Sequence, residues 1–148
     1  MKKVVIDSCV FVKLFLDEDN YRQTREFMKS ISESDVPILV PSVFIYEVYY
    51  ISQKHGVDLN FTDRLLNEYQ EHNLKEIKLN SIVINKTKEI IATTSHPKSG
   101  FPSFYDASYH ALAMLNNCDF ITADKKHYDK TKQLGSIKLL DDIVSKNL

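Results

Sequence analysis

Four acidic residues stand out because their surroundings are unusual for charged side chains. They are Asp7, Glu47, Asp106 and Asp124. Carboxylates within about 4 Å of one another repel by roughly 4 kcal/mol per ionised pair at an effective dielectric of 20, so a cluster at pH 7 needs a divalent cation. All-oxygen ligands favour Mg²⁺ or Mn²⁺ over zinc. The four acids are therefore a candidate catalytic metal site.

Asp7 and Asp124 each follow a short apolar run that predicts a strand. In a parallel sheet, ligands gather at the carboxyl ends of the strands, where both residues would lie. Each also has a structural interpretation. Asp7 would close the strand with an Asx turn, and Asp124 would cap a helix that begins at Lys125.

Glu47 is expected to face the protein interior. Its neighbours three and four positions away are apolar: Val43, Phe44, Tyr50 and Ile51. A lone carboxylate on such a stripe is costly unless it is paired, protonated or bound to a metal, so a buried ion pair is the structural alternative. Asp106 has its own alternative, because Ser103 and Asp106 have the spacing of a capping box, worth roughly 0.5–2 kcal/mol without any function.

Short β-branched runs alternate with helical patterns along the chain. We predict strands over 3–6, 37–40, 76–79, 119–122 and 136–140. Helices are predicted over 19–32, from 43 to about 56, after a cap at 58 or 60, over 80–93 and over 104–116. This alternation predicts a parallel α/β sheet with helices on both faces, which can bring the four acids to one edge. The irregular stretch 94–102 leads directly into the Asp106 helix.

Length and composition narrow the function classes. The chain has 148 residues and no visible repeat or long linker, which predicts one domain over 1–148. With 43% hydrophobic residues it can close one core. Lys plus Arg number 19 against 20 Asp plus Glu, a net charge of -1, so any nucleic-acid binding must be local. Cys9 and Cys118 are too few and too far apart for a zinc site or a disulfide framework.

The start of the chain superficially resembles a signal peptide. Asp7 and Lys13 interrupt its apolar run, and no small-residue cleavage site follows. No stretch reaches the roughly 20 apolar residues that span a bilayer. We therefore expect a cytoplasmic protein without a membrane partner.

Together these motifs resemble a PIN domain over about residues 3–140, most like the VapC-type toxins of toxin–antitoxin pairs. The resemblance rests on Val-Val-Ile-Asp7-Ser8, on Glu47, on Tyr105-Asp106-Ala-Ser-Tyr-His-Ala-Leu-Ala and on Phe-Ile-Thr122-Ala-Asp124. It implies a three-layer α/β/α sandwich with a central parallel sheet of about five strands. It also implies an acidic pocket for Mg²⁺ or Mn²⁺ and metal-dependent ribonuclease activity.

Carried over by position, the resemblance makes the four acids the catalytic quartet, with Ser8 and Thr122 as the hydroxyls that organise it. We expect Asp7 and Asp106 to ligate the main ion. Glu47 would act through a metal-bound water or orient the nucleophile, and Asp124 would complete the site or a second ion. The sequence departs from the family at Cys9, where a small polar residue is common.

An acidic site needs nearby cations to hold RNA. Candidate phosphate contacts are Lys98, Lys125 and Lys126. The tyrosines of this region, including Tyr105 and Tyr109, are expected to pack in the core or at an interface rather than stack on bases. The resemblance further implies a homodimer and a small antitoxin protein that blocks the acidic groove.

Three alternatives remain at this point. The first is a PIN nuclease outside a toxin pair, which acts in RNA processing or on DNA. The second, a phosphatase or phosphotransfer domain, is disfavoured because Cys9 stands where an Asp-x-Asp pair needs its second acid and no Gly-rich phosphate loop exists. The third is a catalytically silent binding module whose acids hold no metal.

Overall fold

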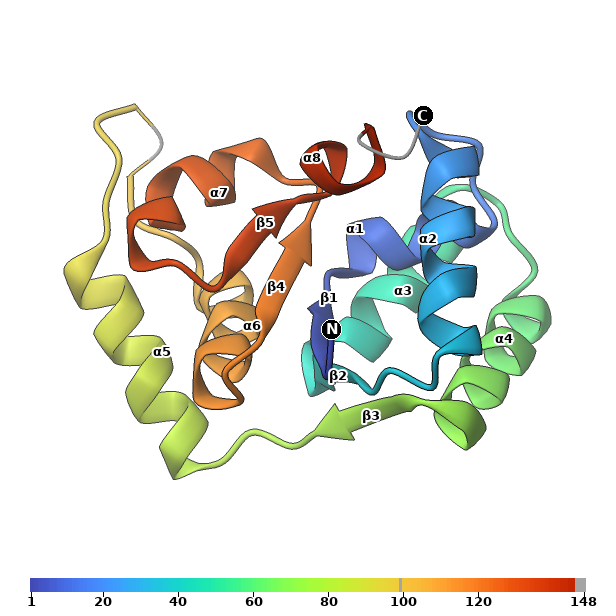
Figure 1. Cartoon of the computed structure of the whole chain (residues 1–148), viewed down its shortest axis with the longest axis horizontal. Coiled ribbons are helices and arrows are strands. Elements are labelled where there is room, and N and C mark those ends of the chain that lie inside the picture. The colour runs from blue at the N-terminus through green and yellow to red at the C-terminus, as the bar shows by residue number, and fades with distance from the viewer. Residues whose placement is uncertain (99, 146–148) are drawn as a thin grey trace.

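The computed structural model describes residues 1–98 and 100–145, and its centre is a five-stranded sheet (Figure 1). The strands are β1 (Val4–Ile6), β2 (Ile38–Pro41), β3 (Leu74–Ile77), β4 (Asp119–Thr122) and β5 (Ile137–Leu139). Their order is β3-β2-β1-β4-β5, and each neighbouring pair is parallel. The predicted α/β fold is confirmed. One domain over 1–148 stays a prediction, whose residues 99 and 146–148 lie outside the described residues.

Helices follow the strands along the chain. They are α1 (Ser8–Phe11), α2 (Tyr21–Glu33), α3 (Ser42–Lys54), α4 (Leu59–His72), α5 (Ser81–Thr93), α6 (Phe104–Leu115), α7 (Lys125–Thr131) and α8 (Leu140–Val144). Two 3₁₀ turns, η1 (Val12–Leu14) and η2 (Lys132–Leu134), extend α1 and α7. The sequence did not predict α1, because four residues are too few for a helical period to be recognised.

The third strand lies two residues earlier than predicted. β3 begins at Leu74, which is buried and pairs with Ile38 of β2. Leu79, the last residue of the predicted run, lies beyond the strand and is 52% exposed. A strand at the edge of a sheet is half solvated, so its partner's register and not a continuous apolar run decides where it starts.

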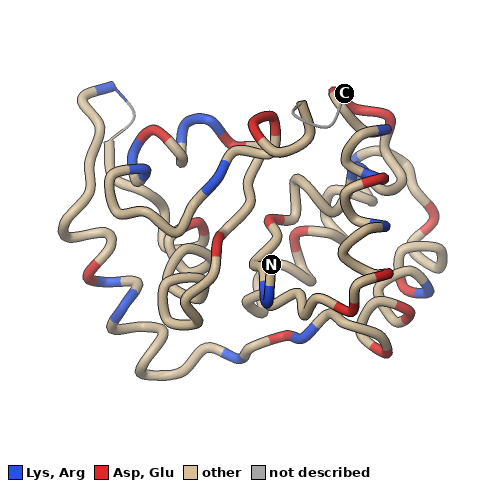
Figure 2. Tube along the Cα trace, viewed as in Figure 1, with Lys and Arg blue, Asp and Glu red and all other residues tan. Residues whose placement is uncertain are grey.

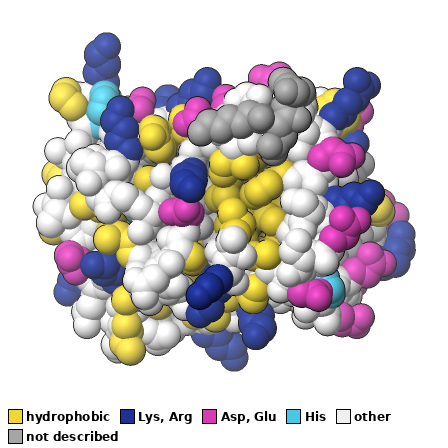
Figure 3. All heavy atoms as spheres, in the orientation of Figure 1, with side chains coloured by type: hydrophobic (Ala, Val, Ile, Leu, Met, Phe, Trp, Pro, Cys, Tyr) yellow, Lys and Arg dark blue, Asp and Glu magenta, His cyan; other side chains and the backbone are white. Residues whose placement is uncertain are grey.

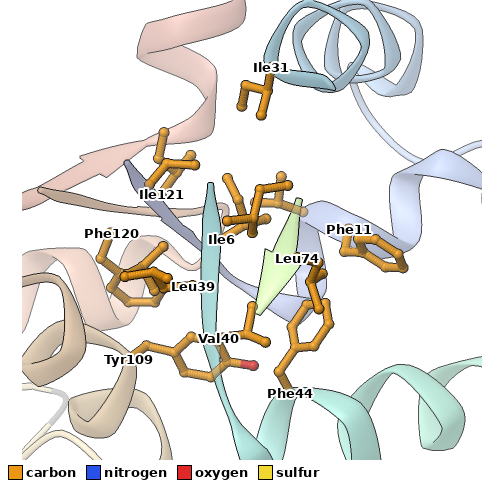
Figure 4. Close-up of a cluster of buried hydrophobic side chains, with 14 of the residues drawn as sticks. Ile6, Phe11, Ile31, Leu39, Val40, Phe44, Leu74, Tyr109, Phe120 and Ile121 are labelled. Carbon is orange, nitrogen blue, oxygen red and sulfur yellow. The ribbon is translucent and has the colours of Figure 1, made fainter. Parts of the chain in front are cut away.

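Helices cover both faces of the sheet and form the three predicted layers. α6 packs against β1, β2 and β4, whereas α2 packs beside α8. Figure 4 shows Ile31 of α2 and Tyr109 of α6 on opposite sides of the strands. β1 and β2 are buried along their whole length because both faces are covered.

The buried face of α3 differs from the predicted stripe. Phe44, Val48 and Ser52 are buried, whereas Tyr50, expected to face inward, is 63% exposed. Ser52 replaces an apolar residue on this face because its hydroxyl oxygen accepts a 2.9 Å hydrogen bond from Thr62 of α4. Glu47 lies at the margin of the buried face and is half-buried.

The topology brings the ends of β1 and β4 together. The chain leaves β1 for β2 and β3 on one side of the sheet and returns for β4 and β5 on the other. Ligands of open α/β sheets bind at such a switch point, outside the carboxyl ends of the strands. Asp7 follows β1 at this point, and Thr122 ends β4.

The face of the molecule shown in Figures 2 and 3 carries both signs of charge. In Figure 2, Lys and Arg alternate with Asp and Glu along α7 and the segments around it. Figure 3 shows mixed charges around a central apolar area on the same side of the molecule. Among the helices of the described residues, none has the length and apolar character needed to cross a membrane.

Candidate active site

Asp7 is the most deeply placed of the four acids, with 6% of its surface exposed. Its main-chain N–H donates to the Ile121 carbonyl at 3.0 Å, which continues the β1–β4 pairing past the end of the strand. The Thr122 hydroxyl donates to Asp7 Oδ2 at 2.7 Å, and the Ser8 hydroxyl lies 3.4 Å from Oδ1. Both hydroxyls that the resemblance singled out therefore contact one carboxyl group.

Burial changes the protonation of this carboxyl. It raises the pKa of Asp7 from the usual 3.8 to about 7, against the lowering effect of the Thr122 hydrogen bond. The negative charges of Asp106 and Glu47 raise the pKa further. An Asp7 carboxyl without a cation is thus partly protonated at neutral pH, and a bound cation would favour its charged form.

Glu47 is held by a tyrosine and not by a cation. The Tyr109 hydroxyl donates to Glu47 Oε1 at 2.6 Å. Within residues 1–98 and 100–145, no Lys, Arg or His lies within 4.0 Å of its carboxylate, so the buried ion pair considered above is not found. Burial raises the pKa of Glu47, the Tyr109 hydrogen bond lowers it and the charge of Asp106 raises it.

Asp106 begins α6 beside its capping residue. The Ser103 hydroxyl oxygen accepts a 3.1 Å hydrogen bond from the Asp106 main-chain N–H, so the cap itself does not use the Asp106 carboxylate. Burial raises the pKa of Asp106, the charge of Asp124 raises it further, and the Ser103 hydroxyl and the Lys130 ammonium lower it. The cap is confirmed, and the carboxylate remains available for a second role.

Asp124 performs the structural role considered for it. Its Oδ1 accepts hydrogen bonds from the main-chain N–H groups of Lys126 at 3.0 Å and His127 at 3.2 Å, which caps α7. Its own N–H donates to the Thr122 hydroxyl oxygen at 3.0 Å. Thr122 thereby links Asp124 to Asp7, and a metal-binding role for Asp124 stays a prediction.

The four acids form an electrostatically coupled series. The charge of Glu47 acts on Asp7, that of Asp106 on both of them, and that of Asp124 on Asp106. In the part of the chain that the structure describes, no three His, Cys, Asp or Glu side chains are arranged to hold one metal ion together. The donors are nevertheless all oxygen, and Mg²⁺ keeps several waters and binds through one or two carboxylates. The donor chemistry therefore fits Mg²⁺ or Mn²⁺ at a pair of these acids.

The candidate RNA-binding lysines have different surroundings. Lys125 Nζ lies 3.7 Å from Asp141 Oδ2 in an exposed ion pair. Lys126 is exposed near the start of α7, and Lys98 is exposed in the turn that brings His96 to pair with Gly100. Their contact with RNA stays a prediction.

Sequence reasoning missed Lys130, a lysine whose charge acts on one of the four acids. Its ammonium donates to the Phe101 carbonyl at 3.2 Å, and its charge lowers the pKa of Asp106. Its helical spacing of four from Lys126 was the available signal. Tyr109 was expected only as a packed residue, and its contact with Glu47 could not be read from spacing.

A PIN domain family model matches residues 4–133, and the chain therefore belongs to the PIN domain family. The resemblance noted in the sequence is confirmed. Comparison with curated proteins returns no match.

Solved structures share this fold at low identity. PAE2754 from Pyrobaculum aerophilum is 16% identical with a TM-score of 0.65, over 97% of this chain and 93% of that one. VapBC2 from Rickettsia felis, bound to a promoter DNA fragment, is 14% identical with a TM-score of 0.67, over 93% and 98%. VapC20 from Mycobacterium tuberculosis, described as a sarcin-ricin loop cleaving toxin, is 8% identical with a TM-score of 0.65, over 86% and 94%. At these identities the likeness shows the fold.

Proposed function

We propose that the chain is a divalent-metal-dependent endoribonuclease that hydrolyses RNA phosphodiester bonds as the toxin of a type II toxin–antitoxin pair. The observation that carries this proposal is the buried Asp7 carboxyl, oriented by Thr122 and facing the charges of Glu47 and Asp106. Perturbed carboxyl groups at the switch point of an α/β sheet are typical of functional sites. Membership of the PIN family supports the nuclease class.

In this proposal Asp7 and Asp106 would hold the Mg²⁺ or Mn²⁺ ion, and Asp124 would complete the site or a second ion. The bound cation supplies Lewis acidity and lowers the pKa of a water. Glu47 would orient the attacking water. The Thr122 hydroxyl keeps Asp7 Oδ2 in place, so the ligand does not have to be ordered when the substrate binds.

The proposed substrate is held by local cations, since the net charge of -1 gives no general attraction for RNA. The candidate phosphate contacts are Lys125, Lys126 and Lys130 of α7, which begins directly after Asp124, together with Lys98. Similar structures described as VapBC or toxin–antitoxin complexes support a small antitoxin partner. We further propose a homodimer and a cytoplasmic location.

Cleavage and metal binding by the wild type and Asp7→Asn test the proposal. The wild type is expected to cleave RNA with Mn²⁺ or Mg²⁺, and addition of EDTA is expected to stop the cleavage. Asp7→Asn is expected to lower kcat/KM at least roughly 100-fold and to weaken Mn²⁺ binding followed by EPR.

Asp119→Asn is the matched control, because Asp119 lies at the other end of β4 and pairs with Lys138 at 3.1 Å. It should cleave as the wild type does. Mn²⁺ binding without cleavage of RNA would reject the ribonuclease, and cleavage of DNA in its place would favour a PIN nuclease outside a toxin pair. Equal Mn²⁺ affinity in the wild type and Asp7→Asn would reject the metal site.

A further inference from the structure

Tyr109 connects the core of the molecule to the candidate active site. It lies on α6, three residues after Asp106, and its side chain is fully buried. Its ring stacks on Phe120 of β4 at a centroid distance of 5.2 Å and an interplanar angle of 15°. Figure 4 shows both rings in the core, with the Tyr109 hydroxyl pointing toward the helix that carries Phe44. That helix is α3, which also carries Glu47.

Packing alone does not require the hydroxyl. A phenylalanine would fill the same space beside Phe120, and a buried hydroxyl is costly unless it forms a hydrogen bond. This hydroxyl donates to Glu47 Oε1 at 2.6 Å, a short distance typical of a hydrogen bond to a carboxylate. Burial and the nearby charges of Asp7 and Glu47 raise the pKa of Tyr109, so the hydroxyl keeps its proton and remains a donor.

Glu47 depends on this contact for its position. It lies at the margin of the buried face of α3, where the Tyr109 hydroxyl forms a short hydrogen bond with its carboxylate and the Ser8 hydroxyl also acts on it. A glutamate has three side-chain torsions, and a free one would turn away from the like charges of Asp7 and Asp106 toward solvent. A rigid donor from the core opposes that movement.

We propose that Tyr109 is a positioning residue, whose hydroxyl holds Glu47 beside Asp7 and Asp106 in the geometry that the reaction requires. This inference rests on the proposed nuclease function. Because Asp106 and Tyr109 lie three residues apart on α6, one helix supplies both a candidate ligand and the group that orients another acid.

The test compares Tyr109→Phe with Tyr49→Phe in the full chain, on an RNA oligonucleotide that the wild type cleaves. Tyr49 is the matched control, since its hydroxyl also donates to a carboxylate, Asp63 at 2.9 Å, from the same helix as Glu47 but at an exposed place. Tyr109→Phe should lower kcat roughly 10-fold or more and leave KM within about twofold. Tyr49→Phe should leave both unchanged.

The double variant shows whether the effect passes through Glu47. In single-turnover cleavage with excess enzyme, Tyr109→Phe should lower the rate in the wild type but not in Glu47→Gln. An equal loss in both backgrounds, or a wild-type kcat in Tyr109→Phe, would overturn the positioning role while cleavage by the wild type still supports the nuclease. A wild type that cleaves no RNA with either metal would instead overturn the proposed function and this role with it.

Discussion

Asp7 illustrates how a single residue combines folding cost and function. The side chain is buried at the end of β1 among other carboxyl groups, so the fold favours its neutral form. A residue chosen for stability alone would be apolar or amide-bearing at this place. The cost is understandable if the charged form is needed to bind a cation, since active sites often contain groups that the fold destabilises.

The raised pKa predicts the pH dependence of stability without metal. The pKa of Asp7 rises from 3.8 to about 7 on folding, so the protonated form stabilises the fold below pH 3.8 and this contribution is lost as the pH rises through about 7. In EDTA at pH 8, the free energy of unfolding of Asp7→Asn should therefore be about 2–4 kcal/mol larger than that of the wild type. At pH 3.5 the two values should differ little.

Urea unfolding measures the difference. Added Mg²⁺ should stabilise the wild type at pH 8 more than it stabilises Asp7→Asn, because a ligand that binds only the folded state stabilises it. A wild type more stable than Asp7→Asn at pH 8 in EDTA would show that the carboxylate is not destabilised by burial.

At the scale of elements, the start of α6 combines a helix cap and a candidate ligand within four residues. Ser103→Ala removes the acceptor of the Asp106 N–H and should cost about 0.5–2 kcal/mol in stability while most cleavage remains. Asp106→Asn keeps that main-chain hydrogen bond and should unfold within about 0.5 kcal/mol of the wild type, with cleavage lowered at least roughly 100-fold.

Thermal unfolding and cleavage rates of both variants separate the two roles. If Asp106→Asn loses stability and activity in the same proportion as Ser103→Ala, the residue serves the helix start and not the chemistry.

At the scale of the whole molecule, two histidines join helices α6 and α7 near β5. His110 of α6 is buried and its Nε2 lies 2.7 Å from the Gly135 carbonyl, as expected for a packed residue. His127 of α7 lies across from it with ring centroids 6.0 Å apart, and the described residues provide no hydrogen-bond partner for its ring nitrogens. Burial, with the charge of His110, lowers the pKa of His127 to about 4.

The buried His127 predicts that the folded protein loses stability in acid. His127 is neutral when folded and takes up a proton near pH 6.5 when unfolded, so its contribution to stability is complete above pH 6.5 and is lost as the pH falls to about 4. Over this range, protonation of His127 in the unfolded state should lower the free energy of unfolding of the wild type by up to roughly 1.4 kcal/mol per pH unit. His127→Leu should flatten the profile in urea titrations, whereas the exposed His55→Leu should not. Parallel profiles for the wild type and His127→Leu would contradict the prediction.

Much of the fold follows from local pattern. The central strands β1, β2 and β4 are short apolar runs because both faces of the sheet are covered, and such runs are visible in any sequence. The edge strand β3 was misplaced by two residues, and Tyr50 was wrongly expected to face inward. In both cases the contact with a neighbouring element, and not the local pattern, decides which side chain is buried.

The candidate site likewise has features that the sequence predicts and features that only the contacts between elements decide. The types and order of the four acids, the capping pair at Ser103 and the hydroxyls at Ser8 and Thr122 are written in the sequence, since each depends on residues nearby in the chain. Tertiary structure alone decided that Thr122 contacts Asp7, that Tyr109 donates to Glu47 and that Lys130 acts on Asp106. The residues of each pair lie from 24 to 115 positions apart in the chain, and only the tertiary fold brings them near one another.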